Sequence, residues 1–227
     1  MSQIDQIEYR GLKAFVREGT SDEFVVKEIG GGTYNKLTIN STDVVVDFGL
    51  NIGMFTCWAL SKGASKVYSY EPEYDNFCLA KRNVDLNGFT DKAQLFNAAV
   101  VGNDDKKRSF SINLKKNKGA HSLVSKRGRD SVDVDCVNFN DVIANVNPTV
   151  IKMDIEGGEY ECLKNIKCNL KNVRELIMEF HHAHLLDVGK EIIFNEVLDI
   201  LRKHFRTVEY RKDPKGAWVS NIYCTNS

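Results

Sequence analysis

The chain has 227 residues, which is enough for one domain with a sizeable core or for two small domains at most. Its 42% hydrophobic and 27% charged residues are typical of a soluble globular protein, and its 31 basic and 31 acidic residues give no net charge. The polar start MSQIDQIEYR excludes a signal peptide, and no apolar run is long enough to span a membrane. We therefore expect a cytoplasmic protein without a membrane partner.

Six cysteines occur without a C-x-x-C pair, and most of them lie in apolar segments. This distribution favours reduced core residues over a disulfide framework or a zinc site. Only three prolines and no low-complexity segment are present, so no linker is visible. We predict a single domain over residues 1–227, with a lead-in over 1–42 and a core over 43–227.

The predicted elements alternate between strands and helices along most of the chain. An opening strand or extended lead-in over Ile7–Val16 precedes a short helix from Ser21, a plausible N-cap, to Ile29. Further strands are predicted at 44–47, 66–70, 94–101, 108–114, 131–137, 149–155 and 175–181, and helices at 54–62, 73–87 and 190–205. The segments 207–211 and 218–225 form a terminal antiparallel hairpin. This order predicts an α/β fold with a mostly parallel sheet and an antiparallel edge.

The strand over 44–47 is followed by the strongest functional pattern in the chain. Asp47 ends the strand, and Gly49 and Gly53 open the helix that follows, where glycine allows a sharp turn and close approach to a ligand. The next strand delivers Glu71 at its carboxyl end, 18 residues beyond Gly53. An acid at that place can accept hydrogen bonds from both hydroxyls of a ribose. The pattern predicts a site for a nucleoside-containing cofactor.

The spacing of the glycines indicates which cofactor this is. A dinucleotide site requires G-x-G-x-x-G, whereas this chain has Asp47 before a single G-x-x-x-G. A carboxylate there would repel a pyrophosphate but suits a cofactor with an ammonium and a sulfonium. We therefore predict S-adenosylmethionine (SAM) and disfavour a nicotinamide cofactor.

Several blocks of the chain resemble the FkbM family of SAM-dependent methyltransferases. They are GTSDEFVVKEIGGGTY (19–34), VVVDFGLNIGMF (44–55), VYSYEPEYDNFCLAKRNVDLNG (67–88), FNAAVVG (96–102) and VIKMDIEGGEYECL (150–163). The resemblance implies a class I methyltransferase fold, which is Rossmann-like and doubly wound, with seven strands of which the last is antiparallel and inserted near the sheet edge. It also implies O-methylation of a hydroxyl on substrates such as polyketides and sugars.

The resemblance assigns the cofactor-binding residues position by position. Asp47, Gly49 and Gly53 would line the methionine end of SAM, and Glu71 would hold its ribose. Asn97 and Ala98 would flank the adenine. The matching blocks add Asn51, Pro72 and Asp154 to this set, and Thr20, Ser21 and Tyr34 fall in a segment that resembles the family's cofactor lid. A helix cap and a core ring are equally plausible roles for Ser21 and Tyr34.

Catalytic candidates cluster at the ends of the strands over 149–155 and 175–181. Lys152, Asp154 and Glu156 alternate with a period of two and so share one side of the strand while it lasts. His181 is the first choice for the general base, because an imidazole titrates near neutral pH. A structural ion network and a histidine that only bonds a carbonyl are the alternatives. A metal site of Asp154, Glu156, Glu179 and His181 matches no standard motif, so no metal is assigned.

The basic residues are unevenly distributed, because nine of them and no acid lie within residues 106–129. This segment would favour an anionic acceptor, although a solvated hairpin is the commoner fate of such runs. We predict a SAM-dependent O-methyltransferase acting on a sugar, glycan or other small hydroxyl compound. The alternatives are a nucleic-acid methyltransferase that grips phosphate with this segment, and a non-catalytic SAM-binding module. The segment has a single aromatic residue, Phe110, so nucleic acid is not favoured.

Overall fold

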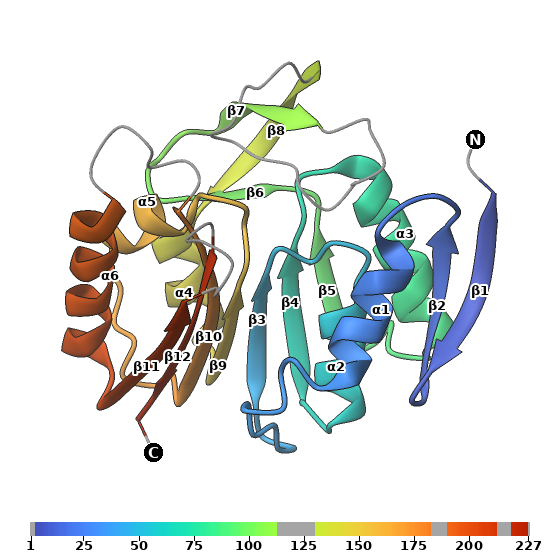
Figure 1. The fold of residues 1–227 in the computed structure, drawn as a ribbon, viewed down its shortest axis with the longest axis horizontal. Coiled ribbons are helices and arrows are strands. Elements are labelled where there is room, and N and C mark those ends of the chain that lie inside the picture. Colours follow the sequence, from blue (N-terminus) through green and yellow to red (C-terminus); the bar gives the residue numbers. More distant parts are fainter. Residues whose placement is uncertain (1–2, 113–129, 183–189, 213–218, 227) are drawn as a thin grey trace.

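The computed structural model describes residues 3–112, 130–182, 190–212 and 219–226, and a seven-stranded sheet forms its centre (Figure 1). The strands lie in the order β11-β12-β10-β9-β3-β4-β5. Their bounds are β3 Val44–Phe48, β4 Lys66–Tyr70, β5 Ala93–Phe96, β9 Val150–Met153, β10 Glu175–His181, β11 Thr207–Lys212 and β12 Val219–Thr225. β12 is antiparallel to β10 and β11, and the other neighbouring pairs are parallel. The predicted fold class, including the terminal hairpin with its inserted antiparallel strand, is confirmed.

The strand order reverses beside β3. From β3 the chain continues to β4 and β5 on one side, and it later returns to place β9 and β10 on the other side. At such a reversal the loops leaving neighbouring parallel strands diverge, and a crevice opens at the carboxyl ends of the strands. The sequence motifs after β3, β4, β9 and β10 all lie at this edge.

Helices cover both faces of the sheet (Figure 1). One face carries α1 Asp22–Gly31, α2 Met54–Ser61 and α3 Tyr74–Leu86, and the other carries α4 Phe139–Val146, α5 Glu159–Lys164 and α6 Lys190–His204. Successive residues of β3 alternate between two cores, because strand side chains point to opposite faces. Val45 packs in the core under α1–α3, whereas Val46 and Phe48 pack in the core under α4–α6.

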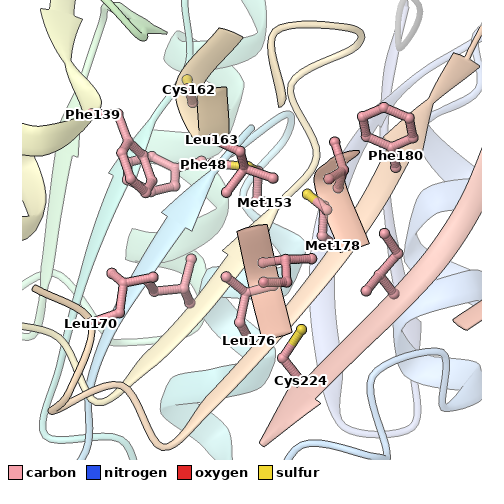
Figure 2. Close-up of a cluster of buried hydrophobic side chains, with 14 of the residues drawn as sticks. Phe48, Phe139, Met153, Cys162, Leu163, Leu170, Leu176, Met178, Phe180 and Cys224 are labelled. Atoms are coloured by element: carbon pink, nitrogen blue, oxygen red, sulfur yellow. The ribbon is translucent and has the colours of Figure 1, made fainter. Parts of the chain in front are cut away.

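Figure 2 shows the core under α4–α6, where Phe48 and Met153 from adjacent strands meet Phe139 of α4. The centroids of the Phe48 and Phe139 rings are 5.4 Å apart, and both side chains are fully buried. The pattern repeats in β9 and β10, where Met153 and Met178 face this core. The intervening positions of the same strands, Lys152 and Glu179, therefore face the α1–α3 side, where the strand ends approach the crevice.

Two smaller sheets flank the main one. β1 Ile4–Tyr9 and β2 Leu12–Arg17 form an antiparallel hairpin, and β6 Ala99–Val101, β8 Asp130–Asn138 and β7 Lys107–Ile112 form a second sheet in that order. The single strand predicted over 7–16 is thus wrong. Arg10 and Gly11 have positive φ angles of 51° and 83°, and they make a turn in the middle of that range.

The strand predicted over 94–101 is divided between two sheets. β5 ends at Phe96 and β6 begins at Ala99, with Asn97 and Ala98 between them. The side-chain amide of Asn97 donates hydrogen bonds to the carbonyl oxygens of Glu71 and Pro72, at 2.8 and 3.1 Å. These bonds hold the chain at the sheet edge while it turns away toward β6.

Helices α4 and α5 were not predicted from the sequence. Ser21 is the N-cap residue of α1, as predicted, but its side chain makes no capping hydrogen bond. The hydroxyl of Thr20 instead accepts a hydrogen bond from the N–H of Asp22 at 3.3 Å. All six cysteines are free thiols, as predicted. No helix in the described ranges has the length and apolarity needed to cross a membrane.

Candidate active site

A cavity opens at the carboxyl edge of the sheet. Its walls come from α1, from the loops after β3, β4 and β9, from the segment around β6, and from β7 and β10. Of the residues predicted from the sequence, those that line it are Gly49, Asn51, Glu71, Pro72, Ala98, Lys152, Asp154, Glu156 and Tyr34. Most of the predicted cofactor and catalytic residues therefore lie around one cavity, while their roles stay predictions.

Gly49 is the point at which the loop after β3 meets the loop after β9. Its φ angle is +90°, which disfavours any residue with a side chain. A Cβ added to Gly49 would lie 1.8 Å from the carbonyl oxygen of Asp154. Only glycine allows the two loops to approach this closely. Gly53 has a different function, because its added Cβ would lie 3.2 Å from Ala80 of α3, and it is not among the residues that line the cavity.

Glu71 presents a buried carboxylate to the cavity. One of its oxygens accepts a hydrogen bond from the N–H of Asn51, and the other accepts one from the N–H of Glu73, both at 2.9 Å. Burial raises the pKa of Glu71 to about 7. Each oxygen keeps a second lone pair, so the fixed carboxylate can accept further hydrogen bonds from two adjacent hydroxyls.

Asp47 lies beneath the cavity and not on its wall, in contrast to the role predicted for it at the methionine end of the cofactor. Its side chain is fully buried, accepts a hydrogen bond from the Thr56 hydroxyl at 2.8 Å and pairs with Lys152. The Lys152 Nζ lies 3.2 Å from the Asp47 carboxylate and donates to the carbonyl oxygen of Gly49 at 2.5 Å. Burial would lower the pKa of Lys152, but Asp47 and Asp154 outweigh it and raise that pKa, so the lysine is a cation.

Three side chains converge beyond Lys152. Ligand atoms of Asp154, Glu156 and His181 all lie within 4.8 Å of one another. Glu156 reaches this position from outside the strand, because β9 ends at Met153 and Glu156 has a left-handed φ of 55°. The predicted strand to Ile155 is therefore too long. Of the three residues it was expected to align, Asp154 and Glu156 lie together here, whereas Lys152 pairs with Asp47.

His181 is held by a buried acid that sequence reasoning did not assign. Its Nδ1 lies 3.0 Å from a carboxylate oxygen of Glu159, and Glu159 is fully buried. The N–H groups of Ile155 and Gly157 donate to the same carboxylate, at 3.0 and 3.2 Å. Glu159 lies in the family-like block over 150–163, where it ends the run K-x-D-x-E-G-x-E over 152–159. This position was the available signal.

The acids around His181 shift the pKa of its imidazole, and its role as general base stays a prediction. Burial would lower the pKa of His181, but Glu159, Glu156 and Asp154 outweigh it and raise that pKa well above its ordinary value. Burial also raises the pKa of Glu156 to about 8 and that of Glu179 to about 7.

One wall of the cavity comes from residues 19–34, the segment that resembles the family's cofactor lid. α1 contributes Val25, Glu28 and Ile29, and Tyr34 follows just after this helix. The Tyr34 ring packs against Phe55, with ring centroids 4.8 Å apart. Glu179, which was considered only as a metal ligand, also lines the cavity, and its alternation with His181 along β10 was a signal for it. Thr20, Ser21 and Asn97 are not among the lining residues.

Only residues 106–112 of the basic segment 106–129 lie within the described ranges. Residues 113–129, which include Gly119–Leu123, lie outside the described ranges. His184 also lies outside them. Within the described part, Arg108 forms ion pairs with Glu161 and Asp105, at 2.6 and 2.8 Å. The Nζ of Lys107 lies 3.7 Å from a carboxylate oxygen of Asp135. These contacts give no support to a phosphate-binding surface at Lys107 and Arg108.

The reversed strand order and the inserted antiparallel strand define a class I methyltransferase fold. Solved structures agree with this. A methyltransferase FkbM from Methylobacillus flagellatus superposes with a TM-score of 0.50 at 19% identity, covering 84% of this chain and 45% of that one. A precorrin-6y C5,15-methyltransferase from Geobacter metallireducens gives 0.51 at 12% identity, covering 93% of both chains.

Sequence comparisons identify the family. The model of the methyltransferase FkbM domain matches residues 47–208. The hexuronic acid methyltransferase AglP of Haloferax volcanii is 29% identical over 142 residues, which are 61% of this chain and 56% of that protein. The methyltransferase sdnD of Sordaria araneosa is 26% identical over 192 residues, or 69% of this chain and 74% of that one. The chain belongs to the FkbM methyltransferase family, and its match spans just over half the length of AglP.

Proposed function

We propose that the chain transfers a methyl group from SAM to a hydroxyl of a sugar, glycan or other small metabolite. The observation that carries the proposal is the pairing of two features in one cavity. Glu71 offers a fixed carboxylate at the end of β4, and Asp154, Glu156 and Glu179 line the same cavity at the ends of β9 and β10. The first feature suits a ribose, and the second suits the activation of a hydroxyl.

The chemistry of the cavity wall fits SAM. Glu71 would hold the ribose hydroxyls, while the apolar side chains of Tyr70, Ala98 and Val100 would contact the base. The backbone of the Gly49–Asn51 loop and the carboxylate of Asp154 would hold the methionine end, where an acid favours the ammonium group. When bound, SAM supplies a methyl group on a sulfonium, which passes in line to an oxygen.

The remaining task of the protein is to align the acceptor, exclude water and remove a proton. We place proton acceptance on Glu179, because it lines both the main cavity and a small hollow that adjoins it. The hollow is also lined by Tyr34, Lys152 and Asp154, so it lies beside the cofactor end of the cavity. Hydroxyl groups of a sugar can donate hydrogen bonds to these carboxylates, and the activity named for AglP, on a hexuronic acid, supports a sugar acceptor.

Calorimetric titration of the purified protein with SAM, S-adenosylhomocysteine and NAD tests the cofactor. Wild-type protein should bind the first two and not NAD. Glu71→Gln should bind SAM about 10- to 100-fold more weakly, because hydrogen bonds to a charged acceptor contribute about 1.5–3 kcal/mol. Glu28→Gln is the matched control, since Glu28 lines the same cavity from α1 but is not assigned to the ribose.

If the wild-type protein does not bind SAM, the proposed function is wrong. A Glu71→Gln variant that binds SAM as tightly as the wild type, while folded, would show that the ribose is held elsewhere. The two results are therefore separable, and the second would leave the cofactor assignment standing.

The affinity for SAM should also depend on pH in a specific direction. The pKa of Glu71 is raised to about 7, so the empty protein carries mostly the protonated acid at pH 6 and mostly the carboxylate at pH 8. Hydroxyl donors prefer the carboxylate, so affinity should rise by up to about tenfold between these pH values, with release of a proton on binding. Glu71→Gln should lack this component. Titration in buffers of different ionisation enthalpy measures the proton release, and proton uptake would contradict the assignment.

A further inference from the structure

The spacing of Asp154, Glu156 and His181 is that of ligands around a single ion. The Nε2 of His181 lies 3.5 Å from a Glu156 oxygen and 4.0 Å from Asp154 Oδ1. Around Mg²⁺ or Mn²⁺, ligand atoms at about 2.1 Å from the metal lie about 3 Å apart when adjacent and about 4 Å apart when opposite. The three side chains need only small rotations to meet one cation.

A separate observation concerns one atom of this group. Asp154 Oδ1 is buried and has no hydrogen-bond partner. A buried carboxylate oxygen without a donor is costly unless a positive charge satisfies it. Lys152 does not satisfy it, because its Nζ lies 3.8 Å from the other oxygen of Asp154 and closer to Asp47 and the Gly49 carbonyl oxygen. Asp154 Oδ1 lies 4.0 Å from Nε2 of His181.

The support behind His181 has the form found at metal-binding histidines. Glu159 is fully buried, receives backbone N–H bonds and faces Nδ1 of the imidazole at 3.0 Å. A carboxylate in this position fixes the ring and leaves Nε2 available as a ligand. Nε2 of His181 lies near Glu156 and Asp154. Glu159 therefore holds the ring, whereas Glu156 and Asp154 are available as further ligands.

We infer that Asp154, Glu156 and His181 bind one divalent cation, Mg²⁺ or Mn²⁺, beside the acceptor position of the cavity. Two carboxylate oxygens and one imidazole suit a hard cation, and the remaining coordination positions would hold water or an oxygen of the acceptor. Such a cation would favour an acceptor with several oxygens, and it would lower the pKa of a bound hydroxyl. This catalytic consequence rests on the proposed function, whereas cation binding itself does not.

Titration of the wild-type protein with Mn²⁺, followed by electron paramagnetic resonance of the free ion, tests the inference without an activity assay. We expect one Mn²⁺ site per chain that Mg²⁺ displaces. Glu156→Gln and Asp154→Asn should each weaken Mn²⁺ binding by about tenfold or more, because each removes a charged ligand while keeping its size. Glu28→Gln, which removes an acid that α1 contributes to the same cavity, should bind Mn²⁺ as the wild type does.

Absence of a stoichiometric Mn²⁺ site in the wild type would overturn the inference. Equal weakening by Glu28→Gln would also overturn it, because binding would then reflect only the negative charge of the cavity. Using two ligand variants keeps the test valid if one of them fails to fold, which circular dichroism detects. SAM titration without metal separates the two proposals. If SAM binds but no Mn²⁺ site is found, only the cation proposal is wrong. If a Mn²⁺ site is found but SAM does not bind, only the methyltransferase assignment is wrong.

Discussion

Replacing Lys152 with methionine is expected to lower the free energy of unfolding by about 3–5 kcal/mol, the range measured when one partner of a buried ion pair is removed. The reason is Asp47, whose side chain is fully buried next to the Lys152 Nζ at 3.2 Å. Methionine has a similar length and fills the space, but it leaves Asp47 as an uncompensated charge or forces it to take up a proton. Urea denaturation of both proteins measures the difference.

A double variant distinguishes this electrostatic cause from lost packing. Asp47→Asn removes the charge and keeps a side-chain oxygen that can accept the hydrogen bond from Thr56. In the Lys152→Met, Asp47→Asn protein, part of the lost stability should return, because no unpaired charge is buried. If the two substitutions instead add up to their full separate costs, the pair does not act as a unit.

Replacing Gly49 with alanine should abolish cofactor binding as well as destabilise the protein. The new Cβ would stand 1.8 Å from the Asp154 carbonyl oxygen and 3.3 Å from the Lys152 Nζ. The loops after β3 and β9 must then separate, which displaces Asp154 and the lysine together. We expect a loss of about 2–4 kcal/mol, from left-handed strain and overpacking combined, and no measurable SAM binding. Calorimetry and urea denaturation provide the two measurements.

Gly63 provides a matched control for this substitution. It has a similar left-handed φ of +109°, but an added Cβ there would meet nothing within 4 Å. Gly63→Ala should therefore cost only the backbone strain, about 1–2 kcal/mol, and leave SAM binding intact. If Gly63→Ala also abolished binding, the close approach of the two loops would not be the reason for the effect at Gly49.

The sequence predicts the main sheet well, because its strands have a strong local signal. Val45, Val46 and the apolar residues of β9 and β10 are buried, and polar residues such as Asp154 and His181 stand at or just beyond the strand ends. The site edge follows from this pattern alone. Errors occur where the residue pattern is continuous but the strand is interrupted, as at Arg10–Gly11 and at Asn97–Ala98. In both places a turn interrupts a run of strand-forming residues, and no proline marks it.

The candidate site was predicted in part for a related reason. A motif shows which residues gather at the strand ends, but it does not show which of them face the cavity. Asp47 illustrates this, because it belongs to the motif and yet lies under the cavity wall with Lys152. The contact between His181 and Glu159 joins residues 22 apart in the sequence, so it could not be inferred from the histidine itself. Such charge couplings are tertiary contacts.

The position of α1 has a consequence for how selectivity can change in this protein. The helix supplies Val25, Glu28 and Ile29 to the cavity, and all three precede the family-matched segment 47–208. A buried ion pair between Arg17 and Asp22, with a further bond from Arg17 to Asn76, ties the start of α1 to β2 and α3. Substitutions at Val25, Glu28 and Ile29 would therefore change the shape of one side of the cavity without altering the residues at the strand ends.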